Sequence, residues 1–176
     1  MRILIQGSGS IGQRHYRNAL ALGHEAAFLR AQESMRPFVQ DFFDDEARQG
    51  RVPAVFLDMA SAVETWKPAA LIVATPNHLH MAGALEGASH GLHLLIEKPA
   101  HDHVEGLDEL MRVVDQRNLV CMIGYNLRFH PSLARIKSMI GEGALGTLLS
   151  AAVEVGENIE DWHPWEEYRE TYAPHV

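Results

Sequence analysis

The chain has 176 residues, 47% of them hydrophobic, with 15 Lys and Arg against 23 Asp and Glu and a formal net charge of −8. This composition predicts a globular chain of one domain or slightly more. The negative charge argues against a broad surface for nucleic acid or anionic lipid. The single cysteine, Cys121, excludes a disulfide framework, and we expect it in the core.

No apolar stretch approaches the ~18 residues that a membrane-spanning helix needs. The N-terminal apolar run breaks into glycines at Gly7, before a signal-peptide core could form. We therefore expect a cytoplasmic protein with no membrane partner.

Short apolar runs alternate with helical patterns through the first 124 residues. The predicted strands are 2–6, 26–30, 54–57, 70–74, 92–97 and 119–124, and the predicted helices between them are 10–22, 77–90 and 104–117. Alternating strands and helices are typical of the α/β class, with a doubly wound parallel sheet covered on both faces. The acidic stretch 41–48 is expected to be an exposed helix or loop.

Past Gly124 the pattern changes, and we expect residues 125–176 to be the start of a second domain. A helix is predicted at 131–140, a turn at 141–146 and a strand at 147–155. Near the end of the chain, one helical face is predicted to carry four aromatic side chains: Trp162, Trp165, Tyr168 and Tyr172. The lone strand and this aromatic face favour a homodimer.

A glycine-rich turn follows the first predicted strand directly and opens the first predicted helix. It contains Gly7, Gly9, Ser10, Ile11 and Gly12 in a G-x-G-x-x-G pattern. In this context Gly7 permits a tight turn, Gly9 lets backbone N–H groups approach a pyrophosphate, and Gly12 lets helix and strand pack closely. The partial positive charge of the helix N-terminus then faces the phosphates. A merely tight strand-to-helix turn is the alternative.

The second predicted strand ends at Arg30, eighteen residues after Gly12. An NAD site usually has Asp or Glu at this point to accept from the ribose hydroxyls, whereas Arg accommodates a 2′-phosphate. The coenzyme is therefore NAD or NADP, with NADP favoured by Arg30. Two alternatives stay open: Arg30 caps an exposed strand end, or Glu33 serves NAD.

The most apolar predicted strand ends in a polar turn. Thr75 and Asn77 offer groups to a cofactor or a helix cap, and Pro76 fixes the turn. His78 and His80 form an H-x-H pair, but on a helix their side chains point about 200° apart, and no third ligand has a matching spacing. We therefore expect no metal site.

Glu97 and Lys98 end the next central strand, at the same carboxyl edge. Burial of an amine disfavours its charged form, while a neighbouring carboxylate favours it, and the residues alone leave open which effect dominates. After the sixth strand, Asn126 could hydrogen-bond a nicotinamide or sugar, and Arg128 could pair with a substrate oxygen or a carboxylate. Alternatively, Lys98 is a strand-end lysine with a solvated head, and Arg128 fastens its own segment.

Taken in this order, the glycine turn, the segments 74–80 and 97–99, and Asn126-Leu-Arg-Phe129 resemble the glucose–fructose oxidoreductase / inositol dehydrogenase / rhizopine catabolism family over roughly the first 130 residues. The resemblance implies a Rossmann domain, residues 1–124, that binds NAD(P). An α+β domain that holds the substrate would follow. Lys98 would transfer a proton at the substrate hydroxyl or carbonyl. The other residues implied at the coenzyme site are Thr75, Pro76, Asn77, His80, Glu97, Asn126 and Arg128.

The implied function is an NAD(P)-dependent oxidoreductase that transfers a hydride between nicotinamide and a sugar or cyclic polyol. The aromatic stretch 161–172 is similar to relatives that act on nucleotide-linked or amino sugars. Family members continue for about as much chain again, so we expect a truncated substrate domain. The alternative is a catalytically inert nucleotide-binding module that dimerises through its C-terminal strand and aromatic residues.

Overall fold

The computed structural model of the protein describes residues 1–30, 37–156 and 158. The chain divides into two units, Met1–Gly124 and Tyr125–Val176, and each is described by itself. Glu33 and the aromatic stretch 161–172 lie outside the described residues. None of the helices in the described part of the chain is long and apolar enough to cross a membrane.

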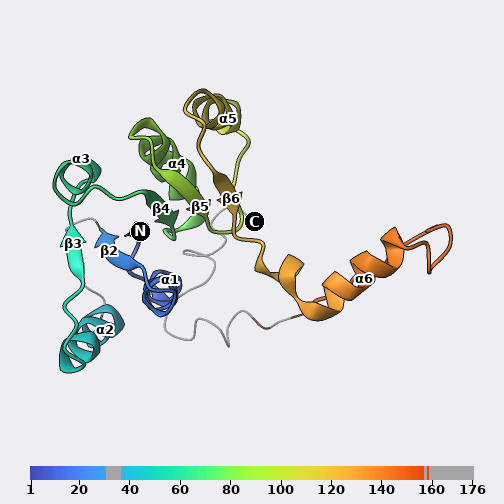
Figure 1. The fold of residues 1–176 in the computed structure, drawn as a ribbon, viewed down its shortest axis with the longest axis horizontal. Coiled ribbons are helices and arrows are strands. Elements are labelled where there is room, and N and C mark those ends of the chain that lie inside the picture. Colours follow the sequence, from blue (N-terminus) through green and yellow to red (C-terminus); the bar gives the residue numbers. More distant parts are fainter. Residues whose placement is uncertain (31–36, 157, 159–176) are drawn as a thin grey trace. The chain divides into compact units, whose positions relative to one another are not determined.

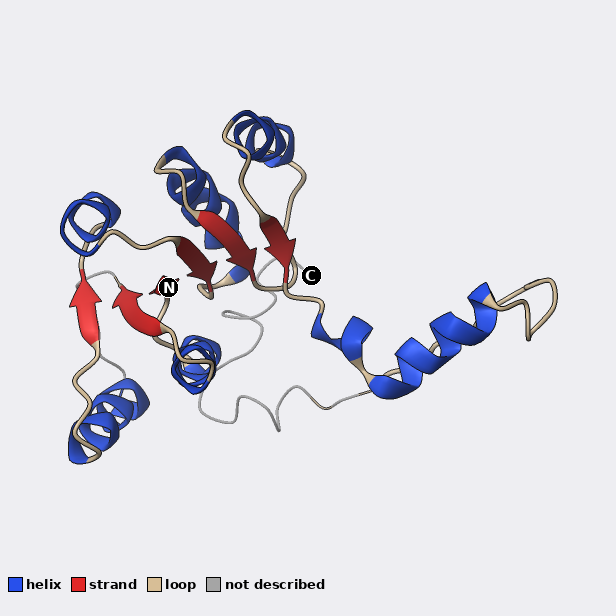
Figure 2. Ribbon diagram, viewed as in Figure 1, coloured by secondary structure: helices blue, strands red, loops and turns tan. Residues whose placement is uncertain are grey.

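The first unit is built on one parallel sheet of six strands (Figures 1 and 2). The strands are β1 Arg2–Gln6, β2 Glu25–Leu29, β3 Ala54–Phe56, β4 Ala70–Val73, β5 His93–Ile96 and β6 Cys121–Ile123. Their order is β3-β2-β1-β4-β5-β6, and every neighbouring pair is parallel. This confirms the predicted doubly wound α/β sheet, and all six predicted strands are present.

Helices cover both faces of this sheet, as Figure 1 shows. The helices α1 Ser10–Ala21 and α2 Pro37–Arg48 lie on one face, whereas α4 His80–Ser89 and α5 Leu107–Gln116 lie on the other. Three short elements complete the unit: α3 Met59–Ser61, the π-helical turn η1 Ala62–Trp66 and the 3-10 turn η2 Asn77–Leu79. The central strands are therefore buried on both sides, as their continuous apolar runs predict.

Alternation along the central strands divides the core into two layers. Leu71 and Val73 of β4 pack with Ala84 and Ala88 of α4, and all four are fully buried. Ile72, between them, belongs to the opposite layer with the aromatic rings under α1 and α2. Half-buried Cys121 contacts the first layer, and burial raises the pKa of its thiol.

The acidic helix α2 corrects the expectation of an exposed segment at 41–48. Phe42 is buried, and its ring makes an edge contact with Tyr16 of α1 at a centroid distance of 5.7 Å. The Glu46 side chain is also buried, 1% exposed, although its sequence neighbours are acidic and solvated. The sequence shows the charge of Glu46 but not the arginines that neutralise it, which come from outside the helix.

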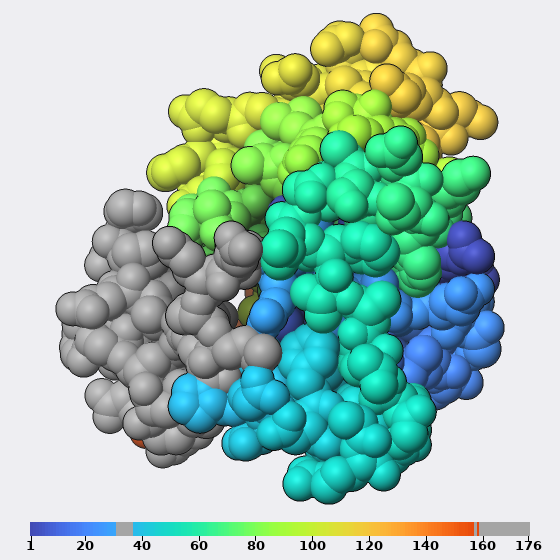
Figure 3. Space-filling view, turned by 90° about the vertical axis from the view of Figure 1, so that its left-hand side faces the viewer, coloured from blue at the N-terminus to red at the C-terminus, as the bar shows by residue number. Residues whose placement is uncertain are grey.

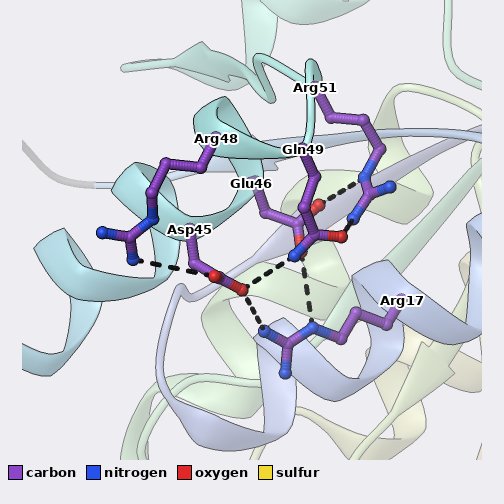
Figure 4. A network of polar contacts seen from close by, with 6 residues as sticks. All are labelled: Arg17, Asp45, Glu46, Arg48, Gln49 and Arg51. Atoms are coloured by element: carbon purple, nitrogen blue, oxygen red, sulfur yellow. Dashed lines mark hydrogen bonds and ion pairs between the residues drawn. The ribbon is translucent and has the colours of Figure 1, made fainter.

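Those arginines form the network in Figure 4. Arg17 Nε donates to Glu46 Oε1 at 3.4 Å, and Arg51 Nε donates to Glu46 Oε2 at 2.5 Å. Asp45 pairs with Arg17 and Arg48 at 3.8 and 3.6 Å. The Glu46 carboxylate thus ties α1 to α2 and to the turn that precedes β3. Figure 3 shows the atoms of α2 (cyan) and of the segment that leads into β3 (teal) side by side on one face.

The described part of the second unit contains helices and irregular backbone but no strand. It contains the 3-10 turn η3 Asn126–Phe129 and the helix α6 Pro131–Gly141, which confirms the helix predicted at 131–140. The strand predicted at 147–155 is wrong, because residues 147–156 form no strand. A strand needs a neighbour to complete its hydrogen bonds, and the described residues after Gly124 supply none.

Candidate functional site

The candidate site lies where the carboxyl ends of β1 and β4 meet. The chain leaves β1 toward α1 on one face of the sheet and leaves β4 toward α4 on the other. The strand order reverses direction between these two strands. In open α/β sheets, ligands bind in the crevice at such a switch point.

The turn that follows β1 contains two glycines that lie so close to neighbouring backbone atoms that no other residue type would fit. Gly7 has φ of +105°, and a Cβ built on it would lie 2.5 Å from the Ala74 carbonyl oxygen. A Cβ on Gly12 would lie 2.1 Å from the carbonyl oxygen of Gly7. Both obstructing atoms belong to the backbone, so neither can move aside cheaply. Gly7 therefore lets the glycine turn lie against the backbone that follows β4. Gly12 lets the first turn of α1 lie against the backbone of Gly7.

The N-terminus of α1 has no side-chain partner. Its N-cap is Gly9, no side chain accepts a hydrogen bond there, and the first turn has no acidic residue. Nothing lies within 4 Å of a Cβ built on Gly9. Ser10 and Ile11, which open the helix, are exposed. Uncapped N–H groups and the helix dipole favour an anion at this position.

Buried polar atoms without a partner gather at the same edge. In the described part of the chain they are Gln6 Oε1, Arg30 Nε and Thr75 Oγ1, which follow or end β1, β2 and β4. Buried polar atoms are rarely left without a hydrogen bond, so three at one edge call for an explanation. Gln6 Oε1 lies against the backbone of Gly83 in α4. Arg30 and Thr75 remain as groups that a polar ligand would satisfy.

The Arg30 side chain is placed between β2 and α2. Its backbone N–H donates to the Phe56 carbonyl at 3.1 Å, and its guanidinium carbon lies 5.8 Å from the centre of the Phe43 ring. The cation therefore rests on an aromatic face at the end of β2. In a dinucleotide site this strand end faces the adenosine ribose.

The two histidines after β4 differ sharply in environment. His78 is exposed, whereas His80 is 1% exposed. His80 Nδ1 lies 2.8 Å from the Pro99 carbonyl oxygen, and its Nε2 lies 2.8 Å from the Thr75 carbonyl oxygen. These contacts place His80 beneath the edge, where it links the β4 turn to the cis Lys98–Pro99 turn.

Glu97, next to Lys98, is held by a residue that the sequence patterns did not single out. His15 Nε2 of α1 lies 2.7 Å from Glu97 Oε1, and the Lys98 backbone N–H donates to Glu97 Oε2 at 3.3 Å. The hydrogen bond from His15 is the main cause that lowers the pKa of Glu97. His15 lies three residues after Gly12, which places both on one face of α1. This spacing is the sequence feature that could have pointed to His15.

Asn126 and Arg128 belong to the second unit, on η3. The Arg128 guanidinium carbon lies 5.7 Å from the centre of the neighbouring Phe129 ring. The structure thus brings together the predicted residues from Gly7 to Lys98 at one edge. The expected roles of Asn126 and Arg128 stay predictions.

These features define a class. A parallel sheet in the order 3-2-1-4-5-6, with a glycine turn at the switch point and an uncapped helix N-terminus beside it, is an NAD-binding Rossmann domain. The orphaned Arg30 and Thr75 atoms and the open space at Gly9 fit such a coenzyme.

The family follows from sequence comparison. Residues 1–125 match GFO_IDH_MocA, described as an oxidoreductase family with an NAD-binding Rossmann fold. The chain belongs to this family, which confirms the resemblance seen in its motifs.

Relatives within the family are longer than this chain. Levoglucosan dehydrogenase of Pseudarthrobacter phenanthrenivorans is 38% identical over 90 residues, 51% of this chain and 22% of that protein. UDP-N-acetylglucosamine 3-dehydrogenase of Acidithiobacillus ferrooxidans superposes with a TM-score of 0.64 and 26% identity over 78% of this chain and 42% of its own. Scyllo-inositol dehydrogenase of Lactobacillus casei superposes with a TM-score of 0.68 and 24% identity, over 83% of this chain and 42% of its own. The chain therefore spans less than half the length of these proteins.

Proposed function

We propose that this chain binds NAD(P) at the carboxyl edge of its sheet, as part of an oxidoreductase that transfers a hydride between nicotinamide and a sugar or cyclic polyol. One observation carries the proposal. The open N-terminus of α1 lies at the same sheet edge as two buried polar atoms without partners, Arg30 Nε and Thr75 Oγ1. A dinucleotide offers a diphosphate to the helix N-terminus, the adenosine ribose or its 2′-phosphate to Arg30, and further polar groups to Thr75.

Each part of the edge has a separate role in this proposal. The backbone N–H groups of Ser10 and Ile11 hold the diphosphate, with Gly9 leaving room for it. Arg30 holds a 2′-phosphate, so NADP is favoured over NAD. The turn from Thr75 to Asn77 faces the coenzyme beyond the diphosphate.

Lys98 is the proposed catalytic residue. A nicotinamide coenzyme, when bound, would supply the hydride chemistry of the reaction. Lys98 takes up the hydroxyl proton when the substrate is oxidised and returns it when a carbonyl is reduced. Its position at the end of β5, on the edge that also carries Gly7 and Thr75, supports this role.

The substrate class is supported by the relatives. Their names specify levoglucosan, scyllo-inositol and a UDP-linked amino sugar as substrates of those proteins. A sugar or cyclic polyol, including nucleotide-linked and amino sugars, is therefore the proposed substrate of the protein that contains this chain. Asn126 and Arg128 are proposed to contact the coenzyme as well.

Titration of the chain with NADPH and NADH, followed by coenzyme fluorescence, tests the proposal. We expect both to bind, with NADPH tighter. Arg30→Leu should remove about 1.5–3 kcal/mol from NADPH binding alone, which is the usual value of a hydrogen bond to a charged group. Equal losses for both coenzymes would contradict the assignment of Arg30, and no binding of either would overturn the function.

A second candidate is a nucleotide-binding module without catalysis. The described residues after Gly124 form helices and no strand, so this part of the chain shows no sheet that could hold a substrate. Assay with a panel of sugars and polyols separates the two candidates, because binding without turnover favours the module.

We also propose that the chain is a cytoplasmic homodimer. Leu133, Ile136 and Ile140, spaced along one side of α6, are each about half exposed, which supports an apolar contact with a partner surface. Light scattering after size-exclusion chromatography should give twice the chain mass of 19.6 kDa. A mass equal to one chain would contradict the dimer.

A further inference from the structure

The contact between His15 and Glu97 joins two parts of the site that are 82 residues apart in sequence. His15 lies on α1, the helix whose N-terminus is proposed to hold the diphosphate. Glu97 directly precedes Lys98 at the end of β5. The two side chains are only 18% and 21% exposed, so the contact is partly shielded from water and salt.

Glu97 is held on three sides. His15 Nε2 lies 2.7 Å from Oε1, and the Lys98 N–H donates to Oε2 at 3.3 Å. On the third side is Gly124, which follows β6, and a Cβ there would come within 3.2 Å of Oε2. The carboxylate therefore occupies a place formed by α1, β5 and the end of β6. A freely rotating surface glutamate has no such set of neighbours.

The same carboxylate binds the main chain of Lys98. Since the Lys98 N–H and His15 share one carboxylate, α1 restrains the backbone from which the lysine side chain projects. Below the edge, His80 fixes the next residue of the same turn by its contact with the Pro99 carbonyl. Catalytic groups need such support, because small displacements of a positioned side chain cost much of its effect.

We propose that His15 is a positioning residue for Lys98: through Glu97, it fixes the end of β5 against the coenzyme helix α1. The inference rests on the proposed function for the importance of Lys98, but the restraint itself is a property of the chain without coenzyme. Binding of a diphosphate at the N-terminus of α1 is thereby coupled to the placement of the lysine.

The test measures the accessibility of Lys98 by chemical acetylation and peptide mass spectrometry. The chain has three lysines, so Lys67 and Lys137 serve as internal standards. His15→Leu removes the ring nitrogen, and His15→Gln keeps an N–H donor. His90→Leu is the matched control, because His90 is exposed at the end of α4. All labelling is done well below each variant's melting temperature.

Without coenzyme, His15→Leu should raise the acetylation rate of Lys98 relative to both standards by at least about threefold, since a hydrogen bond to a charged group is lost. His15→Gln and His90→Leu should stay within about twofold of the unmodified chain. A Lys98 rate in His15→Leu that is unchanged, slower, or equal to that of His90→Leu would overturn the proposal.

A double-variant cycle covers the case in which His15→Leu loosens the fold as a whole. In a Glu97→Leu background, His15→Leu should add nothing further to the Lys98 rate, because the group through which it acts is gone. Additive effects would show a general loosening and contradict the proposal.

The coenzyme arm separates this inference from the proposed function. Saturating NADPH should slow acetylation of Lys98 in the unmodified chain, and this protection should weaken in His15→Leu. Full protection in that variant contradicts the coupling. If NADPH binds no variant, the proposed function fails, while the rates without coenzyme still decide whether His15 positions Lys98.

Discussion

Alanine substitutions at Gly9 and Gly12 separate coenzyme binding from folding. The two glycines lie three residues apart in one turn, yet their surroundings are opposite. A Cβ on Gly9 would have nothing within 4 Å, whereas a Cβ on Gly12 would meet a backbone oxygen at 2.1 Å. A turn that merely connects strand to helix gives no reason for Gly9 to be glycine, but a turn that holds a diphosphate does.

For Gly9→Ala we expect almost no change in stability. The backbone angles of Gly9, φ −67° and ψ −177°, are open to alanine. Alanine is a poorer N-cap than glycine, but it also reduces the conformational entropy of the unfolded chain. These two effects nearly cancel, so the free energy of unfolding should change by about 0.5 kcal/mol or less. Coenzyme binding should weaken by about 10- to 150-fold, the loss of one hydrogen bond to a charged phosphate.

For Gly12→Ala we expect a loss of folding stability. Ordinary van der Waals contact begins near 3.4 Å, so the new methyl group forces the loop and helix apart by more than 1 Å. Overpacking costs about 1–3 kcal/mol, and the better helix propensity of alanine returns up to about 1 kcal/mol. A net loss of about 1–2 kcal/mol lowers the melting temperature by about 2–8 °C.

Thermal unfolding by circular dichroism and titration with NADPH measure the two effects on the same samples. We expect Gly9→Ala to be stable but to bind NADPH poorly, and Gly12→Ala to be destabilised. Unchanged NADPH affinity in Gly9→Ala would refute the assignment of this turn to a diphosphate.

Three further predictions concern single side chains. Lys98→Ala, assayed with an active sugar or polyol, should lower turnover by roughly 10²–10⁴-fold with NADPH affinity nearly intact; unchanged turnover removes Lys98 from the chemistry. Glu46→Gln should lower the free energy of unfolding in urea by about 1–3 kcal/mol; this is less than for a fully buried ion pair, because Arg17 and Arg51 are partly solvated. A cost equal to that of Asp41→Asn, at an exposed position of the same helix, would contradict the network. The lowered pKa of Glu97 stabilises the fold fully above the ordinary glutamate pKa, and this contribution is lost as pH falls through the folded value. The difference in melting temperature between the unmodified chain and Glu97→Gln should therefore shrink in that acidic range, and a constant difference would argue against the contact.

The sheet was predictable from sequence because its strands are short, apolar and separated by glycine and proline signals. Leu71 to Val73 lie in a continuous apolar run, as is typical of a strand buried on both faces. The glycine turn was equally clear, because its pattern stands between a strand and a helix. Local residue pattern was enough wherever the structure depends on neighbours in sequence.

The errors arose where a residue depends on a distant partner. Glu46 lies in an acidic run, and nothing local shows that Arg17, 29 residues earlier, takes part in its burial. The contact of His15 with Glu97 spans 82 residues and was missed for the same reason. The residues from 147 to 156 have a strand-like pattern, but pattern alone cannot supply the neighbouring strand that a sheet requires.

The most direct test of the central claim is a crystal structure of the chain grown with NADPH. We expect density for a diphosphate against the first turn of α1, on the backbone N–H groups of Ser10 and Ile11, with a 2′-phosphate at Arg30. An empty first turn at about millimolar coenzyme, where a site of about micromolar affinity is saturated, would contradict it.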